Sequence, residues 1–255
     1  MPETHQPRIE RALALLDRER TYVTDERAAF DRFRARIARL DPSAATPTNP
    51  VSAGDAVACV GTAPRPDPVA QAIQRTYEET VLAVPHYAEE YGEPAKANFA
   101  AELGPEVAVQ VFEAGRVTPP VYETIKSATE QAIADRTTYR ETLTTERESL
   151  ETVREGLDEY ESRAAELGAA VDDSTTSRQC EAIDDELATL EAACADLAAT
   201  RQTLLHDRTT ANLVGITAES LVRFLYADCD ATCPALADIA DCLETIRRQR
   251  ERCLR

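Results

Sequence analysis

The chain has 255 residues, 43% of them hydrophobic, which is enough for one large or two small folded domains. It has no Trp, one Met and five Phe, so closely packed helices are favoured over a thick globular core. The formal charge is −18, the residues from Met1 to Glu10 are polar, and no stretch approaches the roughly 20 apolar residues of a membrane helix. We therefore expect a cytoplasmic protein without a secretion signal or a membrane span.

Residues 1–40 predict one long amphipathic helix. Its stripe positions follow one another in steps of three and four, which keeps one face turned towards a partner helix. Asp41 and Pro42 end the pattern, because proline disfavours a helical conformation in the residue before it. The stripe positions are Ile9, Leu13, Leu16, Arg20, Val23, Arg27, Phe30, Arg34, Ile37 and Leu40.

Two segments without a long repeat follow. Residues 41–66 are rich in proline and small side chains, so they predict a linker. Residues 67–116 predict a cap of short helices. Asp67 is the expected N-cap of the first, with Pro68 at its first helical position. Two more helices are expected at 95–103 and 105–114.

The longest repeat lies between Pro120 and Pro234, a stretch that contains no proline. Its steps of three and four run over 122–171, stop in a polar segment at 172–177, and restart over 180–211. Thr176 and Gln179 have the spacing of a capping box, so the restart predicts a new helix. Residues 117–211 therefore predict a coiled-coil hairpin of two antiparallel helices, and residues 212–255 predict a C-terminal helical cap.

Together these patterns predict an all-α protein in which the long antiparallel hairpin and the N-terminal helix form a coiled-coil-like bundle with small helical caps. Charged residues interrupt the stripes, and burying them unpaired is costly. We expect them to reach the edge of an interface or to pair across it, which fixes the register of the helices. They are Arg20, Arg27, Arg34, Arg136, Glu146, Arg201 and Arg208.

The charge balance is strongly acidic, with 46 Asp and Glu against 28 Lys and Arg, and the only lysines are Lys96 and Lys126. This composition resembles that of proteins from salt-loving archaea. At molar salt the Debye length falls to about 3 Å, which screens the self-repulsion of such a chain. The acidity then indicates little about partners. The Arg-rich residues 247–255 are expected to be a solvated helix end, with nucleic-acid binding as the alternative.

Residues 77–93, with the sequence YEETVLAVPHYAEEYGE, and residues 100–105, AAELGP, resemble an uncharacterised haloarchaeal family of helical, coiled-coil proteins of unknown function. The likeness extends more loosely to 30–33, 225–226 and 234–238. The resemblance implies a halophilic, cytoplasmic setting, and it transfers no catalytic or ligand-binding residue to this chain.

The same stretch gathers Tyr77, His86, Tyr87 and Tyr91. One interpretation is an interaction surface, formed by aromatic rings with polar tips. The other is that these rings seal the helical cap over the end of the long helices. If the chain has a specific contact surface, we place it at these four residues.

Cys229, Cys233 and Cys242 are the candidate residues for a metal or redox site. Cys229 and Cys233 have the short spacing of zinc ligands, whereas Cys242 is further along the chain. The alternative is that all three pack under a C-terminal helix as small apolar residues, so no metal site is favoured. Cys180 and Cys194 fall on stripe positions and are expected in the core.

No Gly-rich phosphate loop, zincin helix or nucleophile elbow occurs, so we predict no enzyme, no cofactor and no small-molecule ligand. The leading hypothesis is a non-enzymatic cytoplasmic scaffold or interaction module that binds a protein partner or a second copy through a helical stripe. A metal- or thiol-responsive regulator that uses the C-terminal cysteines is the first alternative. A nucleic-acid-associated regulator that uses the Arg-rich C-terminus is the second.

Overall fold

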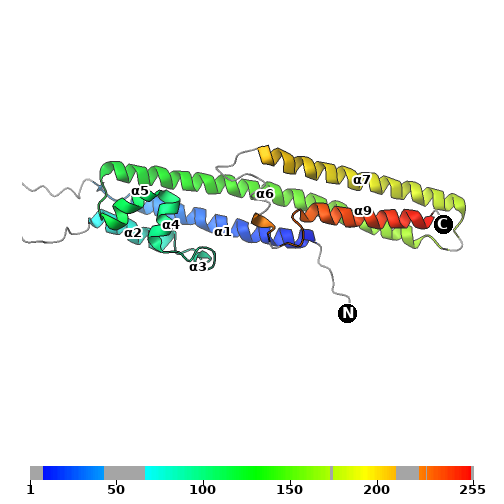
Figure 1. The fold of residues 1–255 in the computed structure, drawn as a ribbon, viewed down its shortest axis with the longest axis horizontal. Helices are drawn as coiled ribbons and strands as arrows, with labels where there is room; N and C mark the ends of the chain where they lie inside the picture. Colours follow the sequence, from blue (N-terminus) through cyan, green and yellow to red (C-terminus); the bar gives the residue numbers. More distant parts are fainter. Residues whose placement is uncertain (1–7, 43–66, 173–174, 211–223, 228, 254–255) are drawn as a thin grey trace, which may run out of the picture. The chain divides into compact units, whose positions relative to one another are not determined.

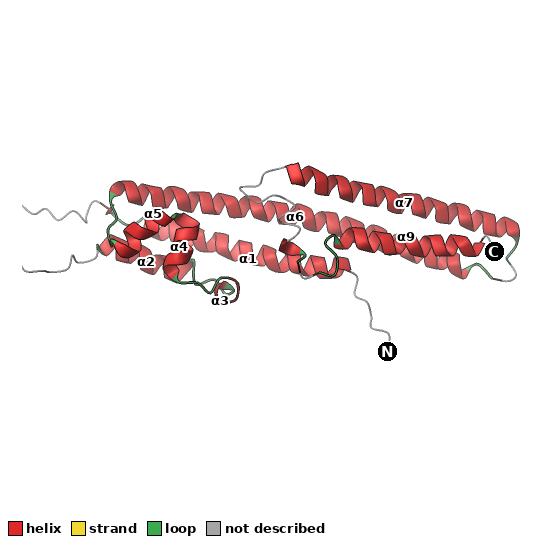
Figure 2. Cartoon of the chain, in the orientation of Figure 1, coloured by secondary structure: helices red, strands yellow, loops and turns green. Residues whose placement is uncertain are grey.

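The fold is known from a computed structural model, which describes residues 8–42, 67–172, 175–210, 224–227 and 229–253. Within these ranges all regular structure is helical and there is no strand, as the all-α prediction requires (Figures 1 and 2). The long helices pack against one another. The elements are α1 (Arg8–Ile37), α2 (Pro68–Thr80), α3 (Tyr87–Glu90), α4 (Ala95–Leu103), α5 (Pro105–Ala108), the π-helix η2 (Val109–Glu113), α6 (Pro119–Ala169), α7 (Ser177–Thr210) and α9 (Pro234–Cys253).

The chain divides into two compact units. The middle unit is Thr21–Arg140, and the terminal unit combines Met1–Arg20 with Glu141–Arg255. Both boundaries fall inside long helices, α1 and α6, whereas the sequence placed its boundaries at the linker and the caps. The physical reason is that different parts of one long helix pack against different neighbours. The predicted linker lies almost wholly outside the described residues, as does the start of the predicted C-terminal cap.

In the terminal unit, α7 runs antiparallel to α6, as the predicted hairpin requires. Glu146 near the start of this part of α6 pairs with Arg201 near the end of α7. Further along, a Cβ added to Gly156 would lie 3.3 Å from the Leu197 side chain, so the two helices approach closely there. The connection begins after Ala169, where α6 ends. The capping box also forms, because the Thr176 backbone N–H donates to Gln179 Oε1 over 2.9 Å.

Helix α9 runs antiparallel to α7 in the same unit, and ion pairs lie along this interface. Arg250 of α9 contacts Asp184 at 2.8 Å and Glu191 at 2.7 Å, both on α7. The start of α1 joins them, because Arg8 contacts Asp238 of α9 at 2.9 Å. Asp238 also accepts the Ile9 backbone N–H over 2.8 Å, which satisfies one free donor in the first turn of α1.

In the middle unit, short helices enclose an aromatic core with the second part of α1 and the first part of α6. The Tyr77 ring meets Phe33 and Phe99 edge-on, with centroids 5.3 and 4.8 Å away. Asp67 caps α2 as predicted, since its side chain accepts the Val69 N–H over 2.8 Å. The core residues of this unit include Phe30, Phe33, Ile37, Ile73, Tyr77, Phe99, Leu103, Val111, Tyr122 and Ile125.

The segment predicted as one helix over 105–114 is instead α5 followed by the π-helix η2. The wider turn of a π-helix leaves backbone carbonyls to be satisfied from outside. The Gln74 side chain donates to the Val111 carbonyl over 2.6 Å and supplies one such bond. Gly115 then ends the segment with a φ of 57°, a conformation that favours glycine.

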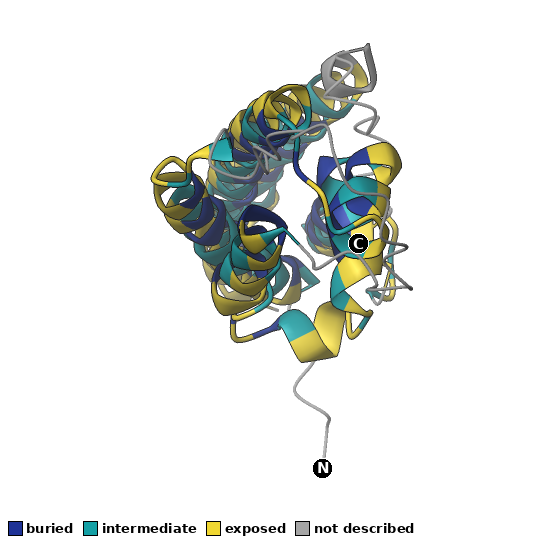
Figure 3. Cartoon of the chain, turned by 90° about the vertical axis from the view of Figure 1, so that its left-hand side faces the viewer, coloured by how far each residue is buried: buried dark blue, intermediate teal, exposed yellow. Residues whose placement is uncertain are grey.

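Among the described residues, most positions of the predicted stripes are buried or half-buried (Figure 3, buried residues in dark blue). On α6, Leu143, Leu150 and Leu157 are all buried. On α1 the stripe prediction is wrong at Arg34, which is exposed and bonds Asp31 over 2.8 Å. Phe33 is buried in the position expected for Arg34, because burying the ring avoids desolvating a charge. No helix among the described residues is long and apolar enough to cross a membrane.

Candidate functional sites

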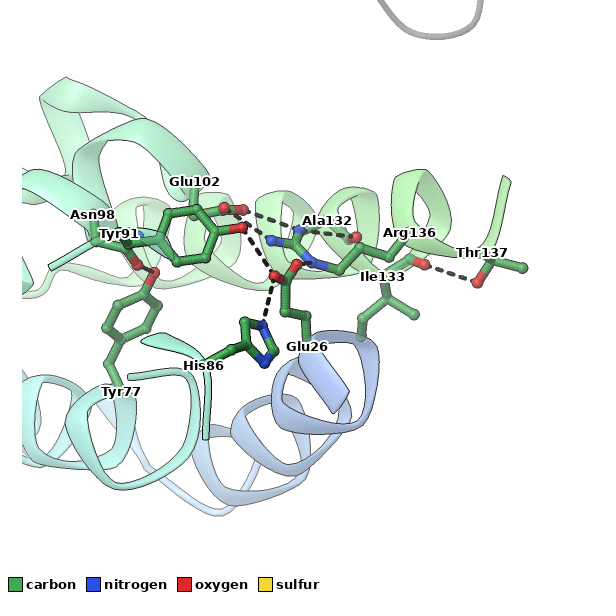
Figure 4. A network of polar contacts seen from close by, with 10 residues as sticks. All are labelled: Glu26, Tyr77, His86, Tyr91, Asn98, Glu102, Ala132, Ile133, Arg136 and Thr137. Atoms are coloured by element: carbon green, nitrogen blue, oxygen red, sulfur yellow. Dashed lines mark hydrogen bonds and ion pairs between the residues drawn. The ribbon is translucent and has the colours of Figure 1, made fainter. Parts of the chain in front are cut away.

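A half-buried carboxylate, Glu26 of α1, is the centre of a polar network in the middle unit (Figure 4). Its Oε1 lies 3.1 Å from His86 Nε2 and accepts the Tyr91 hydroxyl over 2.9 Å. Its Oε2 accepts Arg136 Nε over 2.9 Å. We call this set, together with Glu102, the Glu26 network. It joins α1, both ends of α3, α4 and α6.

Arg136 of α6 neutralises two carboxylates at once. Its two terminal nitrogens donate to Glu102 over 2.9 and 3.0 Å, which is a bidentate arrangement. Its guanidinium carbon lies 4.4 Å from the centroid of the Phe30 ring. Burial alone lowers the pKa of Arg136, but Glu102 and Glu26 outweigh it and raise the pKa above its ordinary value. The guanidinium is therefore a permanent positive charge inside this unit.

Two of the four residues expected on an interaction surface lie in the interior. Tyr77 is fully buried, and its hydroxyl donates to Asn98 Oδ1 over 2.7 Å. Burial, with the charge of Glu102, raises the pKa of Tyr77 far above its ordinary value, so the hydroxyl stays protonated. His86 is only 4% exposed and stacks on Tyr22 at 4.0 Å between centroids. The prediction that Tyr77 and His86 are surface residues is wrong, because each fills an internal polar position.

The other two residues lie at the surface of the middle unit. Tyr91 is 44% exposed although its hydroxyl is held by Glu26, and burial together with that carboxylate raises its pKa. Its ring stacks on half-buried Tyr87, with centroids 5.7 Å apart. The Tyr87 hydroxyl donates to the Glu93 carbonyl over 2.8 Å. We call the two rings the Tyr87/Tyr91 pair. Both phenols are anchored at their polar tips, and the Tyr91 ring is exposed.

The terminal unit contains a second buried network. Arg201 of α7 donates to both oxygens of Glu146 on α6, over 3.0 and 2.5 Å, and the two side chains are 3% and 1% exposed. Tyr226 donates to Glu146 Oε1 over 2.6 Å, and Ser149 accepts from Arg201 over 2.9 Å. Burial lowers the pKa of Arg201, but Glu146 more than compensates and raises it overall. Charged stripe positions were expected to pair across an interface, and these two do.

The candidate metal cysteines do not come together as a set. Among the described residues, no three His, Cys, Asp or Glu side chains gather closely enough to hold a metal ion. Cys229 and Cys233 are half-buried in the segment before α9. Cys242 lies two turns into α9, where it is buried, and its Sγ lies 3.7 Å from the Sγ of buried Cys194 on α7. A ligand set of Cys229, Cys233 and Cys242 therefore fails, because the third thiol faces a different helix.

The C-terminal arginines mostly have acidic neighbours within the terminal unit. Arg247 and Arg250 contact α7 carboxylates, both of them bonding Glu191 over 2.7 Å. Arg248 pairs with Glu244 one turn earlier on α9. Arg255 lies outside the described residues. Arg247 and Arg250 are therefore part of the α7–α9 interface and not only a solvated helix end.

A family model, described as a domain of unknown function (DUF7260), matches residues 7–250 and so covers nearly the whole chain. The chain belongs to the DUF7260 family. This agrees with the resemblance to an uncharacterised family that residues 77–93 and 100–105 carry. No curated protein matches the DUF7260 chain significantly, and no solved structure does either.

Sequence reasoning missed Glu26 and Glu102, because neither falls on a stripe and each is one of many acids in the chain. The sequence did contain one signal for this network, Arg136. A charged residue at a stripe position needs an acidic partner when it is buried. The pairing of Glu146 with Arg201 carried a stronger signal. Opposite charges at stripe positions of two arms predicted to be antiparallel point to one another once the turn is placed.

Proposed function

We propose that this DUF7260 protein is a non-enzymatic helical interaction module that binds a protein partner through the Tyr87/Tyr91 pair. The observation that carries the proposal is Tyr91, an aromatic ring 44% exposed whose hydroxyl is bonded to the half-buried Glu26 carboxylate. Among the described residues only Val109 and Phe224 are further large hydrophobic side chains with comparable exposure.

A fixed aromatic ring is suited to binding a protein. Aromatic residues are enriched among the side chains that dominate binding energy at interfaces. An immobilised ring also loses less conformational entropy when a partner covers it. Glu26 holds the Tyr91 tip, and the stacked Tyr87 ring supports its face. We expect the partner to present an apolar or cationic side chain to this pair.

The charged interior supports a structural role over a catalytic one. A general acid or base needs a proton that a substrate can reach. Glu26 and Glu146 each already accept bonds from two or more side chains, and Arg136 and Arg201 neutralise them. Such ion pairs fix the register of the helices that they join. As part of the same proposal, we place the protein in the cytoplasm of a halophilic archaeon, on the basis of the acidic, lysine-poor composition.

Photo-crosslinking tests the contact surface directly. A photo-reactive amino acid replaces Glu90, which is exposed on α3 next to Tyr91, and a second variant carries it at exposed Glu130 on α6 as the matched control. Each is irradiated in a high-salt lysate of the native host. We expect a discrete crosslinked species from position 90 and none of the same mass from position 130.

Competition then ties the species to the Tyr87/Tyr91 pair. Excess unlabelled wild-type protein and Tyr91→Phe, which keeps the ring, should both suppress the crosslink. Tyr91→Ala should suppress it at least tenfold less effectively. Equal competition by Tyr91→Ala would show that the surface is not used. A crosslinked mass of twice the chain would identify a second copy as the partner.

A further inference from the structure

We propose that Cys194 and Cys242 are an oxidisable thiol pair that forms a disulfide bond between α7 and α9 when the protein meets a hydroperoxide. The two Sγ atoms are 3.7 Å apart, and the residues are separated by 48 positions in the sequence. A disulfide bond has an S–S distance of about 2.05 Å, so the sulfur atoms need to approach by roughly 1.7 Å. This site does not depend on the proposed function, since it lies in the terminal unit.

The two helices hold these thiols in register from one side. Arg250 bonds Asp184 and Glu191, and Arg247 bonds Glu191 as well. These contacts run between α7 and α9 on the C-terminal side of Cys242 and the N-terminal side of Cys194, as an antiparallel pair requires. The thiols therefore face one another because of the helix pairing.

The pair also has an asymmetry that suits stepwise oxidation. The hydrogen bond from Cys242 lowers the pKa of Cys194, whereas the same bond and burial raise the pKa of Cys242. Of the two thiols, Cys194 is therefore the more readily ionised. A thiolate is the nucleophile in thiol oxidation, so Cys194 is the residue that attacks the oxidant first.

The chemistry balances with one equivalent of hydroperoxide. The Cys194 thiolate attacks one peroxide oxygen and breaks the O–O bond, which gives a sulfenic acid and releases hydroxide, or alkoxide from an alkyl hydroperoxide. The Cys242 sulfur then attacks the sulfenic sulfur and displaces hydroxide. The hydroxide takes the Cys242 proton and leaves as water. The two thiols lose two electrons in total, and the peroxide is reduced by two.

Burial makes the site selective. Cys194 and Cys242 are 0% and 1% exposed, so the oxidant reaches them when α7 and α9 separate locally. Cys180 and Cys253 are half-buried further along the same helices, and burial, with a smaller contribution from Cys180, raises the pKa of Cys253. They provide an internal comparison. A bulky oxidant should reach them first, whereas hydrogen peroxide needs only a small local opening of the core.

Peptide mapping of the intact, folded protein tests the proposal. Fully reduced wild-type protein is treated with hydrogen peroxide in molar KCl, the remaining thiols are alkylated in denaturant, and the chain is cut after Asp and Glu. Such cleavage separates Cys180 from Cys194 at Glu181, and Cys233 from Cys242 at Asp238. We expect a linked peptide pair containing Cys194 and Cys242, lighter than the two reduced peptides by about 2 Da. Reduction before digestion should abolish it.

Two further arms make the outcome decisive. The thermal midpoint of the oxidised wild type should rise by several degrees over that of the reduced protein, because the bond closes a long loop of the unfolded chain. Cys194→Ala should show no such rise, and the double variant Cys229→Ser/Cys233→Ser should behave as wild type. Linked peptides that form only in denatured protein would show that the site does not exist. Their absence from the folded protein would show the same, provided that a small-molecule thiol in the same reaction is fully oxidised.

Discussion

Arg201 of α7 and Glu146 of α6 form a bidentate ion pair in the core of the terminal unit, with contacts of 3.0 and 2.5 Å. Tyr226 donates to the same carboxylate over 2.6 Å. A buried pair of this kind adds little net stability compared with an apolar contact of equal shape, but removing one partner leaves the other charge buried alone. The pair therefore specifies how α6 and α7 align.

Replacing one member of this pair should destabilise the terminal unit strongly. We expect Glu146→Ala to lower the free energy of unfolding by about 3–5 kcal/mol, since Arg201 is left as an uncompensated buried charge. Urea denaturation followed by circular dichroism measures it. The matched control is Arg248→Gln, which breaks an exposed pair with Glu244 on α9 and should cost about 0.5 kcal/mol or less.

Replacing the whole buried set should recover most of that loss. The triple variant Glu146→Leu/Arg201→Met/Tyr226→Phe removes both charges and the hydroxyl that would otherwise lose its acceptor. We expect it to unfold within about 1–2 kcal/mol of wild type, because apolar groups of similar size often replace buried ion pairs without loss. A triple variant as unstable as Glu146→Ala would mean that the charges themselves stabilise the fold.

In the middle unit, Tyr77→Phe should cost about 1–3 kcal/mol of unfolding free energy. The ring still fits between Phe33 and Phe99, but Asn98 Oδ1 loses a buried donor. Tyr87→Phe is the control, because its hydroxyl bond to the Glu93 carbonyl is only partly buried. We expect the Tyr87 substitution to have the smaller effect, and an equal effect would contradict the importance of the buried position.

The pairing of α7 with α9 should weaken in acid. Hydrogen bonds from Arg250 lower the pKa of Asp184 below its ordinary 3.8, and those from Arg247 and Arg250 lower the pKa of Glu191 below 4.5. A lowered carboxyl pKa in the folded state contributes stability that is fully present above the unfolded-state values and is lost as the pH falls through the lowered ones. Thermal midpoints of wild type and Arg250→Gln should therefore differ by a constant amount above about pH 5 and converge below about pH 4. A constant difference down to pH 2 would contradict this origin.

Salt dependence tests the proposed halophilic setting. Because the chain carries a formal charge of −18, we expect dilution from molar KCl to low salt to reduce its helicity through self-repulsion. Circular dichroism at 222 nm follows the change. An equal concentration of a neutral osmolyte is the control, since it does not screen charge. Helicity that is unchanged on dilution would argue against adaptation to high salt.

The sequence predicted the helices well because their signals are local. The bond of Asp67 to α2 and the reciprocal bonds of Thr176 and Gln179 at α7 follow from residue type and spacing alone. The division into two units could not be predicted from local signals. A stripe with steps of three and four residues has the same sequence pattern whichever helix packs against it. The boundary inside α1 depends on which distant segment packs against each half.

The candidate sites were harder to predict than the helices. His86 and Tyr77 were recognised as a group, but their burial depends on Glu26, Tyr22 and Asn98 from other segments. The core positions of Cys194 and Cys242 were open to prediction from spacing. Their mutual contact was not, because it needs the register of α9 against α7, which ion pairs between half-buried residues such as Arg250 and Asp184 help to set.

The bond between Arg8 and Asp238 also has a consequence for folding during synthesis on the ribosome. The partner of the first turn of α1 lies 230 positions later, so it leaves the ribosome near the end of synthesis. The first turn of α1 meanwhile lacks its α9 partner, whereas Thr21–Arg140 can complete its core as soon as it has emerged. A nascent chain arrested before α9 should therefore present this first segment to chaperones.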